Sequence, residues 1–135
     1  MKSPQVIVEQ MYAGDAFSKW LGIEVLSNEA GCCRLSMTVR EEMCNGFGIA
    51  HGGISYSLAD SALAFAANGY GKHALSIETG ISHHQPIAAE TEIFAEATAI
   101  KEGRTLGVYQ VLISTKDGAL LASFKGTVLR KENIW

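Results

Sequence analysis

The sequence lacks the features that mark membrane, secreted and nucleic-acid-binding proteins. No apolar run approaches the roughly 20 residues needed to cross a bilayer, and Glu9 interrupts the apolar start too early for a signal peptide. Lysine and arginine number 11 against 14 acidic residues, so the net charge is −3 and no basic face is available for nucleic acid. We therefore expect a cytoplasmic protein without a membrane or nucleic-acid partner.

Cysteine and proline are also scarce, with three cysteines and two prolines in 135 residues. Cys32 and Cys33 are adjacent and would point to opposite faces of a strand, and Cys44 completes no paired metal-ligand spacing. We interpret all three as free thiols of a reducing compartment. No repeat, charge block or linker divides the chain, so we expect a single domain over residues 1–135.

Apolar periodicity and glycine-marked turns predict the order of the elements. The predicted helices span 4–13, 16–21 and 52–67, and the predicted strands span 23–27, 33–39, 73–85, 91–100, 105–115 and 119–130. Short turns such as Asp117-Gly118 join the later strands and indicate antiparallel hairpins. The order predicts an α+β fold in which one curved antiparallel sheet wraps around one long central helix.

Side-chain alternation within these elements predicts which residues share a face, and residue type predicts which aromatic residues are buried. In the strand over 73–85, four residues share one face: Ile77, Thr79, Ile81 and His83. Four aromatic residues are expected in the core or at a subunit interface rather than in a pocket: Phe47, Tyr56, Phe65 and Tyr109.

The long helix over 52–67 is apolar on nearly all sides and carries a single acid, Asp60. A helix of this kind is normally buried, and a carboxylate on it is costly unless a partner or a function compensates. We interpret Asp60 as a candidate reactive group. The alternatives are a helix residue that faces solvent and a buried partner of a serine.

A glycine-rich turn leads into this helix with the sequence Asn45-Gly46-Phe47-Gly48-Ile49-Ala50-His51-Gly52-Gly53. A helix N-terminus offers free N–H groups and the positive end of the helix dipole. Gly52 and Gly53 let a ligand approach the backbone closely. His51 fits a capping residue, a positioning residue or a base, and Asn45 fits a turn residue or a substrate contact.

Three stretches together resemble the hotdog-fold acyl-CoA thioesterases, and above all their phenylacetate-degradation branch: 45–53, 57–62 and 103–109. The likeness extends from about Phe17 to about Arg130. It implies hydrolysis of an acyl-CoA to free acid and CoA, with a phenylacetyl, hydroxyphenylacetyl or other medium-size acyl group. It implies no cofactor, because coenzyme A is part of the substrate. It also implies homodimers with active sites at the subunit interface, often paired into homotetramers.

The resemblance implies roles for individual residues. Asp60 would act as nucleophile or general base on the thioester, the Gly52 N–H would polarise the thioester carbonyl, and Asn45 would place the substrate or water. His51 joins them as a candidate catalytic or positioning residue. A further set is expected to contact the substrate: Gly53, Ser61, His83, His84, Pro86 and Arg104. For Ser61, a hydrogen bond to the helix backbone is the alternative.

The run His83-His84-Gln85-Pro86 departs from the family pattern, in which an arginine precedes the proline. That arginine is one expected contact to the phosphates of CoA, and its loss leaves Arg104, Lys101 and Lys72 as candidates. The two histidines, taken with His51, lack a metal-ligand spacing, so we expect no metal site.

The spacing of Gly52 and Asp60 favours a dimer. Eight residues at 1.5 Å of rise separate them by about 12 Å along the helix, which is too far for both to act on one carbonyl. A two-fold pair of antiparallel helices would place Asp60 of one subunit beside Gly52 of the other and would create two identical sites.

Two other classes of protein fit parts of the pattern. A non-catalytic acyl-CoA-binding protein of the same fold would keep the binding groove without hydrolysis, and a structural or assembly protein would bind no CoA ester. A hydratase of this fold would need a histidine close to the acid at the start of the helix, and Asp60 has no such partner.

Overall fold

The computed structural model describes all 135 residues, and its elements follow the predicted order. In chain order they are α1 (Pro4–Ala13), α2 (Ala16–Leu21), β1 (Glu24–Glu29), β2 (Cys32–Thr38), the 3-10 turn η1 (Glu41–Met43), α3 (Gly52–Asn68), β3 (Lys72–His83), β4 (Glu92–Glu102), β5 (Leu106–Ser114) and β6 (Leu120–Ile134). None of the helices is both long and apolar enough to cross a membrane.

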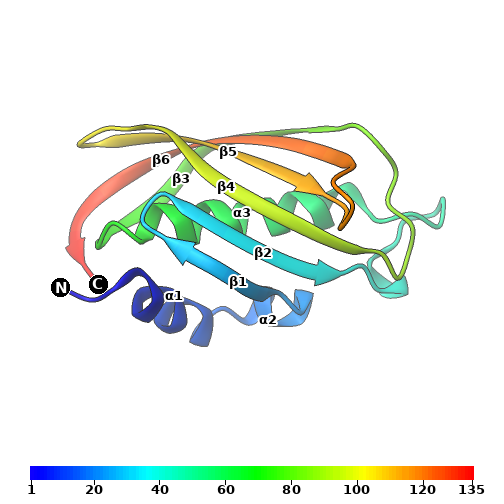
Figure 1. Ribbon diagram of the computed structural model, residues 1–135, viewed down its shortest axis with the longest axis horizontal. Coiled ribbons are helices and arrows are strands. Elements are labelled where there is room, and N and C mark those ends of the chain that lie inside the picture. Colours follow the sequence, from blue (N-terminus) through cyan, green and yellow to red (C-terminus); the bar gives the residue numbers. More distant parts are fainter.

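The six strands form one antiparallel sheet in the order β1-β2-β4-β5-β6-β3. The sheet curves over α3, which contacts every strand, while α1 and α2 lie along the β1 side (Figure 1). This confirms the predicted arrangement of one curved sheet around one central helix.

Local capping explains where the first helices begin and end. Asp15 caps α2 by accepting a hydrogen bond from the Ser18 N–H at 2.9 Å, as its position before the helix predicts. The helix ends at Gly22, whose φ of 76° lies in the left-handed region that favours glycine. At the start of α1, the Ser3 hydroxyl accepts from the Val6 N–H at 3.2 Å.

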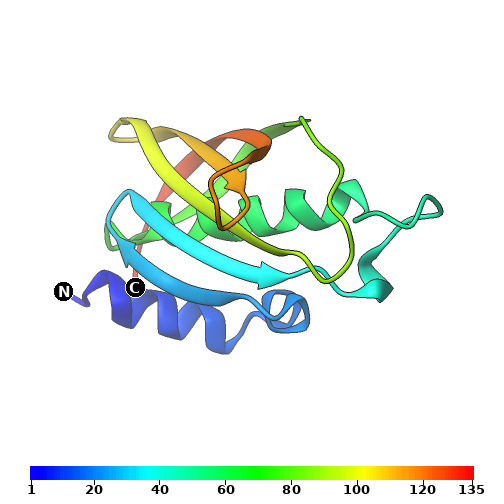
Figure 2. The same cartoon turned by 45° about the vertical axis from the view of Figure 1, so that its right-hand side comes forward.

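The core lies between α3 and the inner face of the sheet. Phe65 on the helix and Tyr109 on β5 are buried, as predicted. Tyr56 packs edge-on against Phe124 at 5.4 Å between ring centroids. Phe47 is not in the core: it is 91% exposed in the turn before α3, which projects beyond the sheet (Figure 2).

Asn68 links the C-terminal end of α3 to Ala74 and Trp135 through side-chain hydrogen bonds. It is 2% exposed, and its amide donates to the Ala74 carbonyl at 3.0 Å while its oxygen accepts from the Ala74 N–H at 2.9 Å. The Trp135 indole N–H donates to the same oxygen at 2.8 Å. Because these hydrogen bonds satisfy a buried polar group, Asn68 joins the helix end, the start of β3 and the end of the chain.

A β-bulge in β3 overturns part of the predicted face. The pairing of β3 with β6 shifts register between Ser76 and Glu78, so Ile77 sits at the extra residue and is 58% exposed. Thr79 and Ile81 face inward as predicted: Thr79 is hydrogen-bonded to Tyr56, and Ile81 packs against the core. The strand ends at His83, two residues earlier than predicted.

The two edge strands of the sheet, β1 and β3, differ in what covers their backbones. At the β1 edge, α1 supplies two side-chain donors: Gln5 Nε2 bonds the Asn28 carbonyl at 2.8 Å, and the Tyr12 hydroxyl bonds the Ile23 carbonyl at 2.7 Å. The β3 edge has no neighbouring strand, and Leu75 on it is 61% exposed. Unpaired edges of this kind are templates for pairing with another chain.

Substituting Gly126 by alanine should destabilise the fold by roughly 1–3 kcal/mol, the usual cost of overpacking a core. A Cβ at Gly126 would lie 2.6 Å from Leu63 Cδ2, so the buried Leu63 side chain would have to shift against its neighbours in the core. Thermal unfolding measures the effect. Gly80→Ala on the neighbouring strand is the matched control, because a Cβ there meets no atom within 4 Å. Equal melting temperatures for the two variants would contradict this account of the packing.

Candidate active site

His51 caps the N-terminus of α3. Its Nδ1 accepts a hydrogen bond from the Gly53 N–H at 2.9 Å, so the neutral ring carries its proton on Nε2. The Ile54 N–H bonds the His51 carbonyl at 2.9 Å. No group of the chain accepts from the Gly52 N–H. Of the two glycines predicted to contact a ligand, Gly52 is therefore the one whose backbone donor is free.

Asn45 shapes the turn before α3. Its Oδ1 accepts from the Phe47 N–H at 2.9 Å, and its carbonyl accepts from the Gly48 N–H at 3.0 Å. Gly48 has a φ of 77°, which favours glycine at this position. The turn interpretation of Asn45 is thus confirmed. Its side-chain NH₂ makes no hydrogen bond within the chain, and its role toward a substrate stays a prediction.

A cavity of about 340 Å³, the turn cavity, opens beside the start of α3. Its lining comprises Asn45, Ile49, Ala50, Gly52, Ser55, His83, His84, Gln85, Pro86 and Ile87. Five residues predicted from the sequence therefore meet at one place, although they come from the turn, the helix and the segment after β3. They are Asn45, Gly52, His83, His84 and Pro86.

His83 lies over the helix start within this cavity. A Cβ placed on Gly52 would be 3.2 Å from His83 Nε2, and His83 Nδ1 is 3.4 Å from the Ser55 hydroxyl. His84 turns to β6, where its Nε2 lies 2.8 Å from the Ser123 hydroxyl. His83 is thus the histidine beside the free N–H of Gly52.

Asp60 lies on the side of α3 that the sheet leaves open, together with Ser57, Ser61 and Ala64. It is half-buried. Burial raises the pKa of its carboxyl above the usual value, and the negative charge of Asp15 raises it further. Asp60 is therefore neither fully solvent-facing nor hydrogen-bonded to a serine within one chain, and its reactive role stays a prediction.

Two cavities meet at Asp60. The helix cavity, of about 220 Å³, is lined by Met11, Asp15, Phe17, Ser18, Tyr56, Ser57, Asp60, Ser61, Ala64 and Phe65. The strand cavity, of about 340 Å³, is lined by Met11, Asp60, Leu63, Ala64, Asn68, His73, Ala74, Leu75, Ser76, Val128 and Trp135. Neither cavity contains Gly52. Because α3 is continuous from Gly52 through Asp60, the separation of about 12 Å along the helix holds within one chain.

Ser61 has a partner that the sequence does not predict. Its hydroxyl lies 2.8 Å from the Ser18 hydroxyl, which in turn donates to Asp15 at 2.6 Å. Since Ser18 has only one hydroxyl proton, Ser61 is the donor to Ser18. A bond from Ser61 to the helix backbone, the alternative considered above, is not formed.

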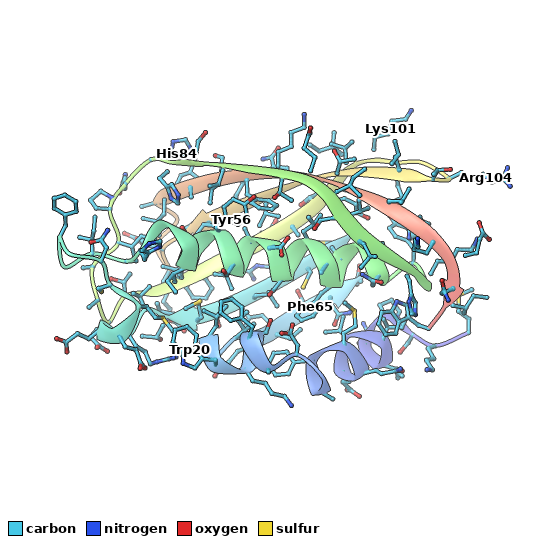
Figure 3. All side chains as sticks on the ribbon, turned by 180° about the vertical axis from the view of Figure 1, so that it is seen from behind. Trp20, Tyr56, Phe65, His84, Lys101 and Arg104 are labelled. Carbon is cyan, nitrogen blue, oxygen red and sulfur yellow. The ribbon has the colours of Figure 1, made fainter.

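The candidate phosphate contacts lie away from the turn cavity. Arg104 and Lys101 are exposed at the β4–β5 turn, at the opposite end of the molecule from His84 (Figure 3). Lys72 pairs with Glu132 at 3.3 Å. One chain therefore does not bring Arg104 to the other predicted residues, and its contact with substrate stays a prediction.

Several residues of these cavities were not predicted from the sequence. Ser55 is one helical turn beyond Gly52 and could be found from that spacing. His73 and Ser76 line the strand cavity together with Asp60 because β3 packs against α3. No group of three or more His, Cys, Asp or Glu side chains is arranged to hold a metal ion, and all three cysteines are free thiols.

The sheet wrapped around a capped helix, with a free N–H at the helix start and a half-buried acid two turns on, defines a hotdog-fold protein. The model of the thioesterase superfamily matches residues 47–122. The chain belongs to this superfamily, as the sequence predicts.

Individual relatives agree with this assignment. The chain is 36% identical over 116 residues to the acyl-coenzyme A thioesterase PaaI of Escherichia coli K12, a match covering 86% of this chain and 83% of that protein. It is 28% identical over 130 residues to human acyl-coenzyme A thioesterase 13, with 93% of each chain covered. The solved structure of E. coli PaaI, from the phenylacetic acid degradation operon, superposes with a TM-score of 0.94 over 97% of this chain and 95% of that chain, at 33% identity.

Asp60→Asn should raise the melting temperature at pH 7. Because burial raises the pKa of Asp60 above the ordinary 3.8, the folded chain binds this proton more tightly than the unfolded chain, and the ionised carboxylate lowers stability at neutral pH. The gain should shrink as the pH falls through the folded pKa and vanish below the unfolded one. Melting curves between pH 3 and pH 8 measure it.

Asp117→Asn is the matched control, because a hydrogen bond from Thr115 lowers the pKa of Asp117. Its ionised form is thus favoured by folding, and the substitution should not stabilise the chain at pH 7. A lower melting temperature for Asp60→Asn at pH 7 would show that the carboxylate is stabilised in the fold, against the argument above.

Proposed function

We propose that this chain is an acyl-CoA thioesterase that hydrolyses an acyl-CoA to the free acid and CoA. The observation that carries the proposal is that α3 presents a free N–H at Gly52 and a half-buried carboxylate with a raised pKa at Asp60. Family membership and the thioesterase names of the relatives support it.

Gly52 would polarise the thioester carbonyl. Hydrolysis passes through a tetrahedral species with negative charge on oxygen, and a fixed N–H aimed at that oxygen contributes roughly 10²–10³ in rate. The N–H of Gly52 stands at the positive end of the helix dipole and borders the turn cavity. His51 holds this geometry by capping the helix, while Asn45 and His83 line the space in which the thioester would lie.

Asp60 would supply the second half of the chemistry. As a general base it would take a proton from water as the water attacks the carbonyl carbon. As a nucleophile it would form a mixed anhydride and release the CoA thiolate, and water would then cleave the anhydride. Its raised pKa makes it a stronger base than an exposed aspartate, provided that the pKa stays below the working pH.

The site would be completed by two subunits. Gly52 and Asp60 of one chain are about 12 Å apart along the helix and line different cavities. A two-fold axis crossing the open face of α3 would bring Asp60 of each subunit to Gly52 of the other. The unpaired β3 edge, with Leu75 and Ile77 exposed, lies beside the helix and supports the same pairing. Two such dimers would form the homotetramer.

The acyl group is proposed to be aryl-acetyl, such as phenylacetyl or hydroxyphenylacetyl, or of similar medium size. The helix cavity beside Asp60 has about 220 Å³ and three aromatic lining residues, Phe17, Tyr56 and Phe65. The operon of the E. coli relative concerns phenylacetic acid. We propose no cofactor. The three free thiols fit a reducing, cytoplasmic compartment, and a CoA phosphate contact by Arg104 would require a second subunit.

Asp60→Asn and Asp60→Ala should each lower turnover by at least about 100-fold, because both remove the base or nucleophile. Thiol release from phenylacetyl-CoA, hydroxyphenylacetyl-CoA, benzoyl-CoA and straight-chain esters measures the loss, and the best ester identifies the acyl class. Asp117→Asn should keep wild-type turnover. Undiminished activity in both Asp60 variants would reject its role, and binding of CoA esters by a wild type without thiol release would identify a non-catalytic binding protein.

Mixed dimers should recover activity that neither parent has. Gly52→Val crowds His83, since even a Cβ would lie 3.2 Å from its ring, and should block the approach to the N–H. A dimer of one Gly52→Val chain and one Asp60→Asn chain contains one intact site if the site is shared between subunits.

Co-expression with two different affinity tags and tandem purification isolates this mixed dimer. About half of the wild-type activity per dimer is expected. No recovery, with both parents folded and paired, would place Gly52 and Asp60 of the same chain in one site.

A further inference from the structure

α2 presents a second carboxylate to the cavity that Asp60 lines. Asp15, the cap of α2, and Asp60, on α3, both border the helix cavity. Asp15 cannot swing away from it, because both of its oxygens are held: Oδ1 accepts from the Ser18 N–H at 2.9 Å and Oδ2 from the Ser18 hydroxyl at 2.6 Å.

Ser18 fixes this carboxylate relative to α3 as well as to α2. It is 1% exposed, and its hydroxyl oxygen accepts from Ser61, the residue next to Asp60. The hydrogen bonds therefore run from Ser61 through Ser18 to Asp15. They place a negative charge at a set position across a small cavity from Asp60.

No cation in the helix cavity offsets the two acids. Its other lining residues are uncharged: Met11, Phe17, Ser18, Tyr56, Ser57, Ser61, Ala64 and Phe65. The Asp15 charge is one of the two causes that raise the pKa of Asp60, after burial. Two carboxylates in one partly dry space disfavour double ionisation.

The other titratable side chain facing Asp60 lies in the strand cavity. It is His73 on β3, whose ring packs on the Trp135 indole at 4.2 Å between centroids. From α1 only the uncharged Met11 faces Asp60. Lys19, the cation of α2, points away and bonds the Ala13 carbonyl at 2.6 Å. Substituting Asp15 therefore changes one charge near Asp60 and leaves the others in place.

We propose that Asp15 is a positioning residue of the active site, held by Ser18 so that its negative charge faces Asp60 and makes the catalytic carboxylate a stronger base. The proposal rests on the proposed function, because it assigns Asp60 to proton transfer or nucleophilic attack. Asp15 is assigned no role in bond making or breaking, because both of its oxygens are held by Ser18. It acts through the field across the helix cavity.

Two charge-removing variants separate this role from helix capping. Asparagine and serine both cap helices well, so Asp15→Asn and Asp15→Ser should keep α2 folded while removing the charge. In both, ¹³C-carboxyl NMR should show Asp60 titrating at lower pH than in the wild type. The acid limb of kcat/KM against pH should move to lower pH with it. Asp117→Asn, the same chemical change in an exposed turn, should move neither.

The outcomes distinguish the possibilities. A lower melting temperature with an unchanged Asp60 titration would show that Asp15 acts only as a helix cap, and it would overturn the proposal. A shifted titration with an unmoved acid limb would also overturn it, because another group would then control turnover. If no variant or wild type releases thiol from any ester, the proposed function fails, and the NMR titration still decides whether Asp15 acts on Asp60.

Discussion

The packing of α3 in the curve of the sheet depends on the absence of a side chain at Gly126 of β6. Leu63 of the helix occupies the space that a Cβ on Gly126 would need. This contact keeps the helix close to the sheet along its inner face, and the helix in turn contacts all six strands. Most of the candidate site residues lie on this helix or border the cavities beside it, so the packing of α3 sets their relative positions.

The same packing leaves one charged side chain, Asp60, on a largely buried helix. A helix buried against a sheet should carry no isolated charge, yet Asp60 stands on it with a raised pKa. The sheet covers one side of α3 and leaves a side with Ser57 and Ala64 partly open. Asp60 is thus half-buried, and the proposed function would draw on both conditions, because partial burial raises its pKa and the open side of the helix would admit a substrate.

The sequence predicts the elements well because their signals are local. The caps at Asp15 and His51, the glycines that end helices and the apolar periodicity of 52–67 each depend on a few adjacent residues. The bulge at Ile77 could not be predicted in this way. Strict alternation assumes that each residue of a strand pairs with one residue of its neighbour, and here the pairing of β3 with β6 shifts register.

Part of the candidate site is also predictable, because some of its residues lie close together in the sequence. Gly52 and Asp60 stand on one helix with a motif around them, and the turn residues lie close in sequence. The approach of His83 to Gly52 depends on the course of the chain after β3. The link from Ser61 to Ser18 spans 43 residues and joins two helices whose packing no local pattern encodes.

The contrast between the two sheet edges limits how copies of this chain can associate through their strands. At β1 the side chains of Gln5 and Tyr12 already occupy two backbone acceptors, and α1 lies in the place of a further strand. At β3 no strand pairs with the edge, and the Asn68 side chain bonds the backbone only at Ala74. A sheet open at both ends can add strands without limit and form fibres, whereas a sheet closed at one end is complete once its open end is paired. The short N-terminal helix would therefore limit association through strand edges to a single pair of chains.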